Sequence, residues 1–456
     1  MIFNFIKKYG LRETWEALIY NNSKIKDFAS NERIKEDLLK GLDYYQITDL
    51  FEDTLAYANK LSKKENGQYY TPDDVCDFLA KQTINFDEGV WCDPCCGTGN
   101  ISYKLVERNP KFLDNMIFCD LDPLSLKLCR FLFSKFFNRD YYSLTNFYNV
   151  DFLKSNLKYD YIIMNPPYIK LRGKEDLYIS FMKKACDCKG FISITPQTFN
   201  SSNESKELRE KVLKFSNIKI YNFDNIPGTI FNGKKKGIFN TNTSNSVRAA
   251  ITVCNNNKMS QKITPLIRWT TDQREELFSK ADNFLVDTEL NGNIFLKIYP
   301  NTKELLNYGD ISLKEIKSNK ETNWKLTIPS TPRYYISASI RDLNRSSKHI
   351  LYFNNEQDML LTYVFLNSSY SYWWWRINDG CITLSKTVLD SLKIKKIDLP
   401  MDLISSLKEE EKNNLVVKLN AGKSNENIKH SKELIKSINS YLGFRDLEWI
   451  QKNTML

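Results

Sequence analysis

The sequence predicts an α/β protein in which a mostly parallel sheet follows a helical segment and precedes a region of mixed α+β structure. Between residues 67 and 254, short apolar runs alternate with helical patterns, and this alternation indicates βαβ units. From residue 259 onward the patterns are less regular, which indicates strands and helices in mixed order. The apolar runs read GVWCD, MIFCD, YDYIIM, GFISIT, IKIYNF and VRAAITV.

Changes of pattern mark both ends of the sheet region. Before it, apolar residues recur at three-to-four spacing in IFNFIKKYGLRETWEALI and ITDLFEDTLAYANKL, which predicts helices over most of residues 1–66. After it, the polar run from Cys254 to Lys258 predicts a boundary, and residues 401–442 are helical again. We therefore expect three parts, over residues 1–66, 67–258 and 259–456.

The composition narrows the class of protein. The chain has 456 residues, of which 42% are hydrophobic, enough for two or three cores, and its 13% aromatic content argues against extensive disorder. No apolar run is long enough to cross a bilayer, and the charged N-terminal pattern predicts an amphipathic helix rather than a signal peptide. The 10 cysteines are unevenly placed, as in reduced cytosolic proteins. We expect a cytoplasmic protein with no membrane partner.

The sequence offers little for a metal centre. It has only 2 histidines, His349 and His430, which nearly excludes histidine-rich metal sites and histidine-based catalytic triads. Cys92 and Cys95 have the spacing of a zinc-binding pair, but Cys92 lies in a strand pattern and no suitable second pair follows. We expect structural thiols and no bound metal.

The charge distribution points weakly to a polyanionic partner. The net charge is +10, and residues 311–350 hold 8 basic and 3 acidic residues. Basic side chains are interleaved there with aromatic ones, as in Arg333-Tyr334-Tyr335, a combination that suits a nucleic-acid backbone; a solvated basic surface is the alternative. The candidate contacts are Arg333, Arg341, Arg345 and Lys348.

A run of tryptophans, Trp373 to Trp375, stands further along the same region. Neighbouring side chains point in different directions, so we expect at least one of them at the edge of a helix or strand. Packing within the domain is the favoured role for all of them.

The first chemical signal is a glycine-rich turn, DPCCGTGN, which follows the strand pattern ending at Asp93 and opens a helical pattern. Gly97 and Gly99 let the backbone turn tightly and let a ligand approach the main chain. Asp120 ends the next apolar run, 23 residues after Gly97, where an acidic residue can accept hydrogen bonds from ribose hydroxyls. An ordinary βα turn is the alternative.

The strongest signal is the corner Asn165-Pro166-Pro167-Tyr168, which follows the apolar run YDYIIM. This places it at the carboxyl edge of the predicted sheet, where open α/β sheets bind ligands. The prolines remove two N–H donors and fix φ, so the corner presents carbonyl oxygens, a rigid amide and a flat aromatic face. Such a site suits a planar amide or amino heterocycle; a rigid loop beside a strand is the alternative.

Taken in order, GQYYTP, DPCCGTGN, Asp120, Asp151-Phe152 and NPPY resemble the motifs of S-adenosylmethionine-dependent DNA adenine-N6 methyltransferases of the gamma group, from restriction-modification systems. The GQYYTP segment also resembles the modification subunits of type I restriction systems. The stretch LNSSYSYWWW followed by ITLSK is similar to a segment of methylase target recognition domains. The resemblance implies a Rossmann-like methyltransferase domain over residues 67–258 and a DNA-binding target recognition domain over residues 259–456.

The resemblance also implies a set of cofactor contacts. The methionine part of S-adenosylmethionine is bordered by Tyr70, Thr71 and Pro72, and the binding turn is shaped by Asp93, Gly97 and Gly99. The ribose hydroxyls are held by Asp120. The adenine amino group is bound by Asp151, and the adenine ring packs on Phe152.

For catalysis, the resemblance implies that Asn165 and the Pro166 carbonyl bind the target amino group, beside the rigid Pro167, and that Tyr168 stacks on a flipped-out base. The family uses a second aromatic residue from a later loop. Phe231 best matches that place, with Phe239 as the alternative because the following loop is long. The implied partners are double-stranded DNA and a separate restriction endonuclease, and we expect a monomer.

Three other interpretations remain. NPPY also occurs in methyltransferases that modify a glutamine amide in translation release factors, but those enzymes are much shorter and lack a second domain. A non-catalytic specificity protein with a vestigial methylase fold is opposed by the intact motifs. A fused endonuclease would require a nuclease motif that residues 1–66 do not show.

Overall fold

The computed structural model describes residues 1–58, 71–170, 173, 175–225, 228–232, 247–270, 272–332, 335–379, 383–420 and 423–444. The chain forms two compact units. The first comprises Met1–Phe199, Asn203–Ile263 and Thr270–Asp287, and the second comprises Asn200–Ser202, Thr264–Trp269 and Thr288–Leu456. Within the described residues, none of the helices combines the length and the apolar character needed to cross a membrane.

The first unit begins with helices α1 (Ile2–Tyr9), α2 (Leu11–Ser23) and α3 (Tyr44–Ala58). Trp15 is fully buried among them, where its ring meets Phe51 edge-on at 5.1 Å and its indole N–H donates to Thr54 Oγ1 at 2.8 Å. Burying an indole with its polar group satisfied stabilises the packing of α2 on α3. The helical prediction for this part of the chain is confirmed over residues 1–58.

The main sheet has the strand order β3-β2-β1-β4-β5-β7-β6-β8-β9. The neighbouring strands β3, β2, β1, β4 and β5 are parallel to one another, whereas β7 is antiparallel to both β5 and β6. The predicted mostly parallel α/β sheet is therefore confirmed, and each of the six apolar runs forms one of its strands. The strands are β1 (Trp91–Asp93), β2 (Met116–Cys119), β3 (Phe147–Tyr148), β4 (Tyr161–Met164), β5 (Gly190–Pro196), β6 (Asn217–Phe223), β7 (Ala249–Asn255), β8 (Ser260–Ile267) and β9 (Val286–Asp287).

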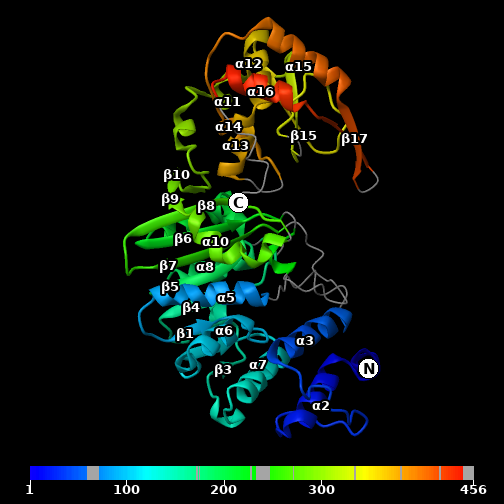
Figure 1. Cartoon of the computed structure of the whole chain (residues 1–456), viewed down its shortest axis with the longest axis vertical. Helices are drawn as coiled ribbons and strands as arrows, with labels where there is room; N and C mark the ends of the chain where they lie inside the picture. The colour runs from blue at the N-terminus through cyan, green and yellow to red at the C-terminus, as the bar shows by residue number, and fades with distance from the viewer. Residues whose placement is uncertain are drawn as a thin grey trace. The chain divides into compact units, whose positions relative to one another are not determined.

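Helices flank this sheet and bury its apolar side chains. α5 and α8 pack against β5, α6 packs against β4, and α7 packs against β3 (Figure 1). α7 begins where the sequence favours it, because Asp122 accepts hydrogen bonds from the backbone N–H groups of Leu124 and Ser125, and Pro123 occupies the first helical position. The helices are α5 (Asp73–Gln82), α6 (Asn100–Arg108), α7 (Pro123–Phe136), α8 (Leu177–Ala185), α9 (Lys206–Val212) and α10 (Leu277–Lys280).

The second unit has the predicted mixed α+β structure. A sheet of order β13-β15-β14 lies with three two-stranded ribbons, β10–β11, β12–β16 and β17–β18, and with several helices. The strands are β10 (Glu289–Asn291), β11 (Ile294–Leu296), β12 (Ile311–Ser312), β13 (Lys317–Ser318), β14 (Trp324–Pro329), β15 (Lys348–Phe353), β16 (Lys393–Ile394), β17 (Leu415–Asn420) and β18 (Lys423–Ile428). The helices are α11 (Leu313–Ile316), α12 (Glu356–Leu366), α13 (Ser369–Asn378), α14 (Lys386–Ser391), α15 (Met401–Asn413) and α16 (Lys432–Tyr441).

The expectation that at least one tryptophan of helix α13 lies at an edge is wrong. Trp373, Trp374 and Trp375 are 0%, 6% and 3% exposed, so none of them stands at an edge, and the packing role is confirmed. The reason is that every residue of α13 is buried, so the helix has no solvent-facing side on which a side chain could emerge. The indole N–H groups of Trp373 and Trp374 donate to Thr302 Oγ1 and Ser391 Oγ, which removes the cost of burying them.

Candidate active site

A cavity of about 590 Å³ lies at the carboxyl edge of β1, β2 and β4. Each of these strands ends in a turn that contributes to its wall, because the carboxyl ends of neighbouring parallel strands meet at one edge of a sheet. Of the residues predicted from the sequence, the cavity brings together Thr71, Asp93, Gly97, Asp120, Asp151, Phe152, Asn165, Pro166 and Pro167. Pro72, Gly99, Tyr168 and Phe231 are not part of its lining, and Tyr70 lies outside the described residues.

The glycine-rich turn leads from β1 into α6 and takes the positive φ angles that favour glycine. Gly97 and Gly99 have φ of 54° and 91°. A Cβ atom on Gly99 would lie 2.6 Å from Cys129 Sγ and 2.8 Å from the ring of Phe133, so this position also lets the turn pack closely on α7. The turn is therefore shaped by both backbone conformation and tight packing.

The carboxylate of Asp120 is tied to that turn. Its Oδ2 accepts a hydrogen bond from the Gly97 N–H at 2.7 Å, and its Oδ1 accepts one from the Asp122 N–H at 2.8 Å. Burial raises the pKa of Asp120, while these backbone donors lower it. Each carboxylate oxygen can accept a second hydrogen bond, so Asp120 retains acceptor capacity toward the cavity.

Asp93, at the end of β1, is only 2% exposed. Its Oδ2 accepts a hydrogen bond from the Ser102 hydroxyl at 2.6 Å, whereas its Oδ1 is buried with no hydrogen-bond partner among the described residues. Burial raises the pKa of the Asp93 carboxyl to about 7, against the lowering effect of its hydrogen bonds. A buried oxygen without a partner is costly, so the wall of the cavity favours a ligand that supplies an N–H or ammonium donor there.

Asp151 and Phe152 form the side of the cavity beyond β3. Asp151 Oδ1 accepts a hydrogen bond from the Leu153 N–H at 3.1 Å, and its Oδ2 lies 3.2 Å from Lys154 Nζ. The ring of Phe152 stacks on Phe181 of α8 with centroids 5.5 Å apart. Phe181 also lines the cavity, but it could not be singled out from the sequence, because its position in a helical pattern indicates only a core residue.

The Asn165 corner is held at two points. The side-chain Nδ2 of Asn165 donates to Thr71 Oγ1 at 3.1 Å, and the backbone carbonyl of Asn165 accepts a hydrogen bond from Cys95 Sγ at 3.3 Å. Both partners also line the cavity. The corner that follows β4 is thus connected to the turn that follows β1 and to Thr71, two residues before α5.

Tyr168 turns toward β5, where its hydroxyl donates to the carbonyl of Ile194 at 2.9 Å. Its ring meets that of Phe231 at 5.9 Å with an interplanar angle of 68°. Phe231 is 3% exposed and lies in the short helix η7 (Ile230–Asn232). The structure therefore brings Phe231 to Tyr168, while Phe239 lies outside the described residues.

In the basic stretch over residues 311–350, some of the side chains that the sequence suggests for DNA contacts are bound to other residues of the protein. Arg345 donates to the carbonyls of Ser347 and Glu426 and to Asn427 Oδ1, so it connects a loop to β18. Lys348 pairs with Asp342 at 2.6 Å. Arg341 is exposed, and Arg333 lies outside the described residues.

Within the described part of the chain the cysteines are free thiols, and no cluster of three or more His, Cys, Asp or Glu residues could hold a metal ion.

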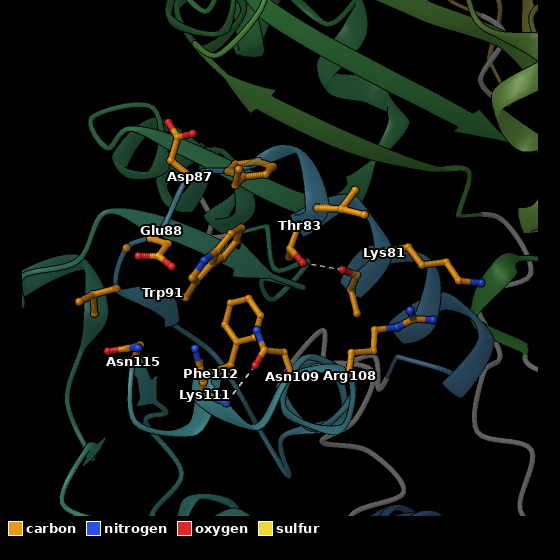
Figure 2. A pocket seen from close by; sticks show the side chains of 15 residues that line it. Lys81, Thr83, Asp87, Glu88, Trp91, Arg108, Asn109, Lys111, Phe112 and Asn115 are labelled. Carbon is orange, nitrogen blue, oxygen red and sulfur yellow. Dashed lines mark hydrogen bonds between the residues drawn. The ribbon is translucent and has the colours of Figure 1, made fainter.

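A second, more open hollow of about 900 Å³ lies at the opposite, amino edge of β1. Figure 2 shows Lys81 and Arg108 on one side, and Asp87, Glu88 and Trp91 on the other. Lys81 and Arg108 both pair with Asp77, at 2.8 and 2.5 Å. None of the predicted site residues lines this hollow, so it is separate from the cavity at the carboxyl edge.

Part of the chain is similar to known proteins. Residues 43–180 match the family model described as N-6 DNA methylase. Type II methyltransferase M.VspI of Vibrio sp. (strain 343) is 28% identical over 209 residues, which is 45% of this chain and 45% of that protein. Modification methylase CviBIII of Paramecium bursaria Chlorella virus NC1A is 27% identical over 195 residues, 37% of this chain and 47% of that protein. The matches therefore span less than half the length of each relative.

Among solved structures, this chain is similar to the type I restriction-modification system methyltransferase subunit from Streptococcus thermophilus. The TM-score is 0.37 at 16% identity, and the match covers 59% of each chain. The glycine-rich turn, Asp120 and the Asn165 corner all fall inside the segment matched by the family model. Residues 43–180 are thus the part of the chain that is similar to N-6 DNA methylases.

Proposed function

We propose that the chain is a site-specific DNA methyltransferase that transfers a methyl group from S-adenosylmethionine to N6 of a flipped-out adenine in double-stranded DNA. One observation carries the proposal. The Asn165-Pro166-Pro167 corner shares a cavity of about 590 Å³ with the glycine-rich turn and with Asp120. An acceptor for an amino group and a pocket for a nucleoside-containing cofactor therefore lie within one cavity.

The residues of the cavity fit that cofactor. Asp93 offers a buried carboxylate oxygen with no partner among the described residues, which suits the ammonium of the methionine part. Asp120 retains acceptor capacity for ribose hydroxyls, Asp151 would take the adenine amino group, and Phe152 the adenine ring. Thr71, which lines the cavity, would border the methionine part together with its sequence neighbours Tyr70 and Pro72. S-adenosylmethionine, when bound, supplies an electrophilic methyl group on a sulfonium.

The task of the chain is to prepare the target nitrogen. An aromatic amino group is a poor nucleophile because its electron pair is conjugated with the ring. Accepting its two N–H groups, through the Asn165 side-chain oxygen and the Pro166 carbonyl, draws the nitrogen toward tetrahedral geometry and turns the pair outward. Correct placement of the reacting groups supplies roughly 7–11 kcal/mol. No strong base is required, since the product nitrogen loses its proton readily afterwards.

The target base must first leave the duplex, which costs a few kcal/mol of unstacking and unpairing. Stacking on an aromatic ring returns about 1–3 kcal/mol for each base. Tyr168 is held by its hydrogen bond to Ile194 and meets Phe231 edge-on, which supports these two rings as the capture site for the extruded base. We assign the reading of the DNA sequence to the region after residue 259, and protection against a separate restriction endonuclease as the purpose of the reaction.

The sharpest test replaces Asn165 by Ala. Because only the amide is removed, the variant should bind S-adenosylmethionine with unchanged affinity in calorimetry but lose most methyl transfer to duplex DNA. Asn109→Ala is a matched control, since Asn109 lies in the hollow at the opposite edge of the sheet and should transfer normally. Methyl transfer by Asn165→Ala at the wild-type rate would contradict the proposal.

A further inference from the structure

A hydrogen bond joins two segments of the cavity wall that are 94 residues apart in sequence. Asn165 Nδ2 donates to Thr71 Oγ1 at 3.1 Å, and Thr71 is 5% exposed. The resemblance to adenine methyltransferases assigns Thr71 only to the border of the cofactor pocket. The structure places its hydroxyl against the amide that would bind the target amino group.

Thr71 is well fixed for such a contact. Its backbone carbonyl accepts hydrogen bonds from Cys76 Sγ at 3.3 Å and from Asn100 Nδ2 at 3.4 Å. Cys76 belongs to α5 and Asn100 is the first residue of α6, so two helices hold the Thr71 backbone in place. A group anchored to regular elements in this way can orient a neighbour precisely enough for catalysis.

Asn165 needs orientation because its side-chain amide has two chemically opposite ends. The C=O end accepts a hydrogen bond from a target amino group, whereas the NH2 end would repel it. The ends diverge from one planar carbon, so a partner for the NH2 end determines where the C=O end points. The backbone of Asn165 is fixed independently, through the Cys95 Sγ contact to its carbonyl.

We propose that Thr71 is a positioning residue for methyl transfer, which holds the Asn165 amide so that its oxygen is presented to the target amino group. This inference rests on the proposed function, because it gives the Thr71 hydroxyl a role toward the target amino group in addition to the place of the side chain at the border of the cofactor pocket. It predicts that loss of the hydroxyl slows the chemical step and leaves the affinity for S-adenosylmethionine unchanged.

The test compares Thr71→Val, which keeps the shape of the side chain, with Thr71→Ser, which keeps the hydroxyl. Single-turnover methyl transfer to duplex DNA should fall on the order of ten- to a hundred-fold in Thr71→Val, the range expected when a catalytic group is misplaced. Thr71→Ser should recover most of that loss. Thr83→Val is the control, because Thr83, directly after the C-terminal end of α5, donates to the Ala80 carbonyl and lies in the hollow of Figure 2; this variant should transfer at the wild-type rate.

A second readout requires no reaction. In the protein without cofactor or DNA, the side-chain amide protons of Asn165, identified by their absence in Asn165→Ala, should exchange with water faster in Thr71→Val than in the wild type. If Thr71→Val does not fold, Thr71→Ala replaces it in both measurements.

Two results would overturn the inference. Transfer by Thr71→Val at the wild-type rate would show that the hydroxyl does not act on Asn165, and a loss of cofactor affinity as large as the loss of rate would place its role on the cofactor. If the wild-type chain transfers no methyl group to DNA, the proposed function fails instead, and the amide exchange still decides whether Thr71 holds Asn165.

Discussion

At the scale of single residues, the site depends on polar groups that are buried at the ends of strands. Asp93 shows this most clearly, because one of its oxygens is satisfied by Ser102 and the other has no partner among the described residues. Such an arrangement costs stability in the free protein and is favourable only when a ligand supplies the missing donor. The contribution of the Asp93 carboxylate to stability should therefore depend on both pH and bound ligand.

Asp93 should make stability depend on pH. Its pKa rises from 3.8 to about 7 on folding, so between these values the folded chain holds a proton that the unfolded chain has lost. Stability from this group is therefore present at low pH and is lost as the pH rises through about 7. The free energy of unfolding of the wild type, relative to Asp93→Asn, should fall by up to about 1.4 kcal/mol per pH unit in this window. Urea unfolding measures the difference, and a constant difference across the window would contradict the assignment.

Tyr168 should matter for the base rather than for the cofactor. Tyr168→Ala removes the stacking ring, so it should weaken the capture of an extruded base more than the affinity for S-adenosylmethionine. Fluorescence of 2-aminopurine at the target position reports the capture, because its emission rises when it leaves the stack. Tyr168→Phe keeps the ring and loses only the hydrogen bond to Ile194, so it should retain most of the capture. Equal losses of base capture and cofactor affinity in Tyr168→Ala would make the residue structural.

At the scale of elements, a buried ion pair connects two parts of the site. Arg274, in the short helix η8 (Asp272–Glu275), donates from Nε and Nη2 to the carboxylate of Asp74 at 2.7 and 3.1 Å. Its Nη2 also donates to the carbonyl of Ile230 at 2.7 Å, directly before Phe231. The first turn of α5 and the segment that carries Phe231 are thus held by one guanidinium.

Removing the Arg274 guanidinium should lower the free energy of unfolding. Arg274→Met leaves the carboxylate of Asp74 partly buried without its partner, and we expect a loss of about 3 kcal/mol in the free energy of unfolding. Arg108→Met is the matched control, since its pair with Asp77 is exposed and should contribute at most about 1 kcal/mol. Urea unfolding of both variants checks this, and equal losses would show that the buried pair has no special role.

The sequence predicted the strands of the sheet better than the contacts between them. Each of the six apolar runs forms a strand, because burial on both faces requires continuous apolar residues. β3 escaped prediction because it has only two residues, Phe147 and Tyr148, too few to show a pattern. The packing role of the tryptophans of α13 was predicted, but one of them was wrongly expected at an edge, because a sequence does not show that a helix is enclosed on all sides. The hydrogen bond between Thr71 and Asn165 and the ion pair of Arg274 join segments that are distant in sequence. Such pairs cannot be predicted from a local sequence pattern.

At the scale of the whole molecule, the net charge of +10 bears on the proposed DNA partner. Lysine and arginine contacts to phosphates release counterions, so the affinity for duplex DNA should fall steeply as salt rises. A protein that contacts about six phosphates loses on the order of a thousand-fold in affinity between about 50 and about 200 mM salt. A salt titration of binding to a duplex checks this, and an affinity independent of salt would argue against a phosphate-dominated interface.

The central claim, that the chain methylates adenine N6 in DNA, is tested most directly by analysing nucleosides from DNA of cells that express it. The wild-type chain should produce N6-methyldeoxyadenosine in one recurring sequence context, and the Asn165→Ala chain should produce none above background. DNA without the modified nucleoside in the presence of folded wild-type protein, or label from S-adenosylmethionine found only on protein, would contradict the claim.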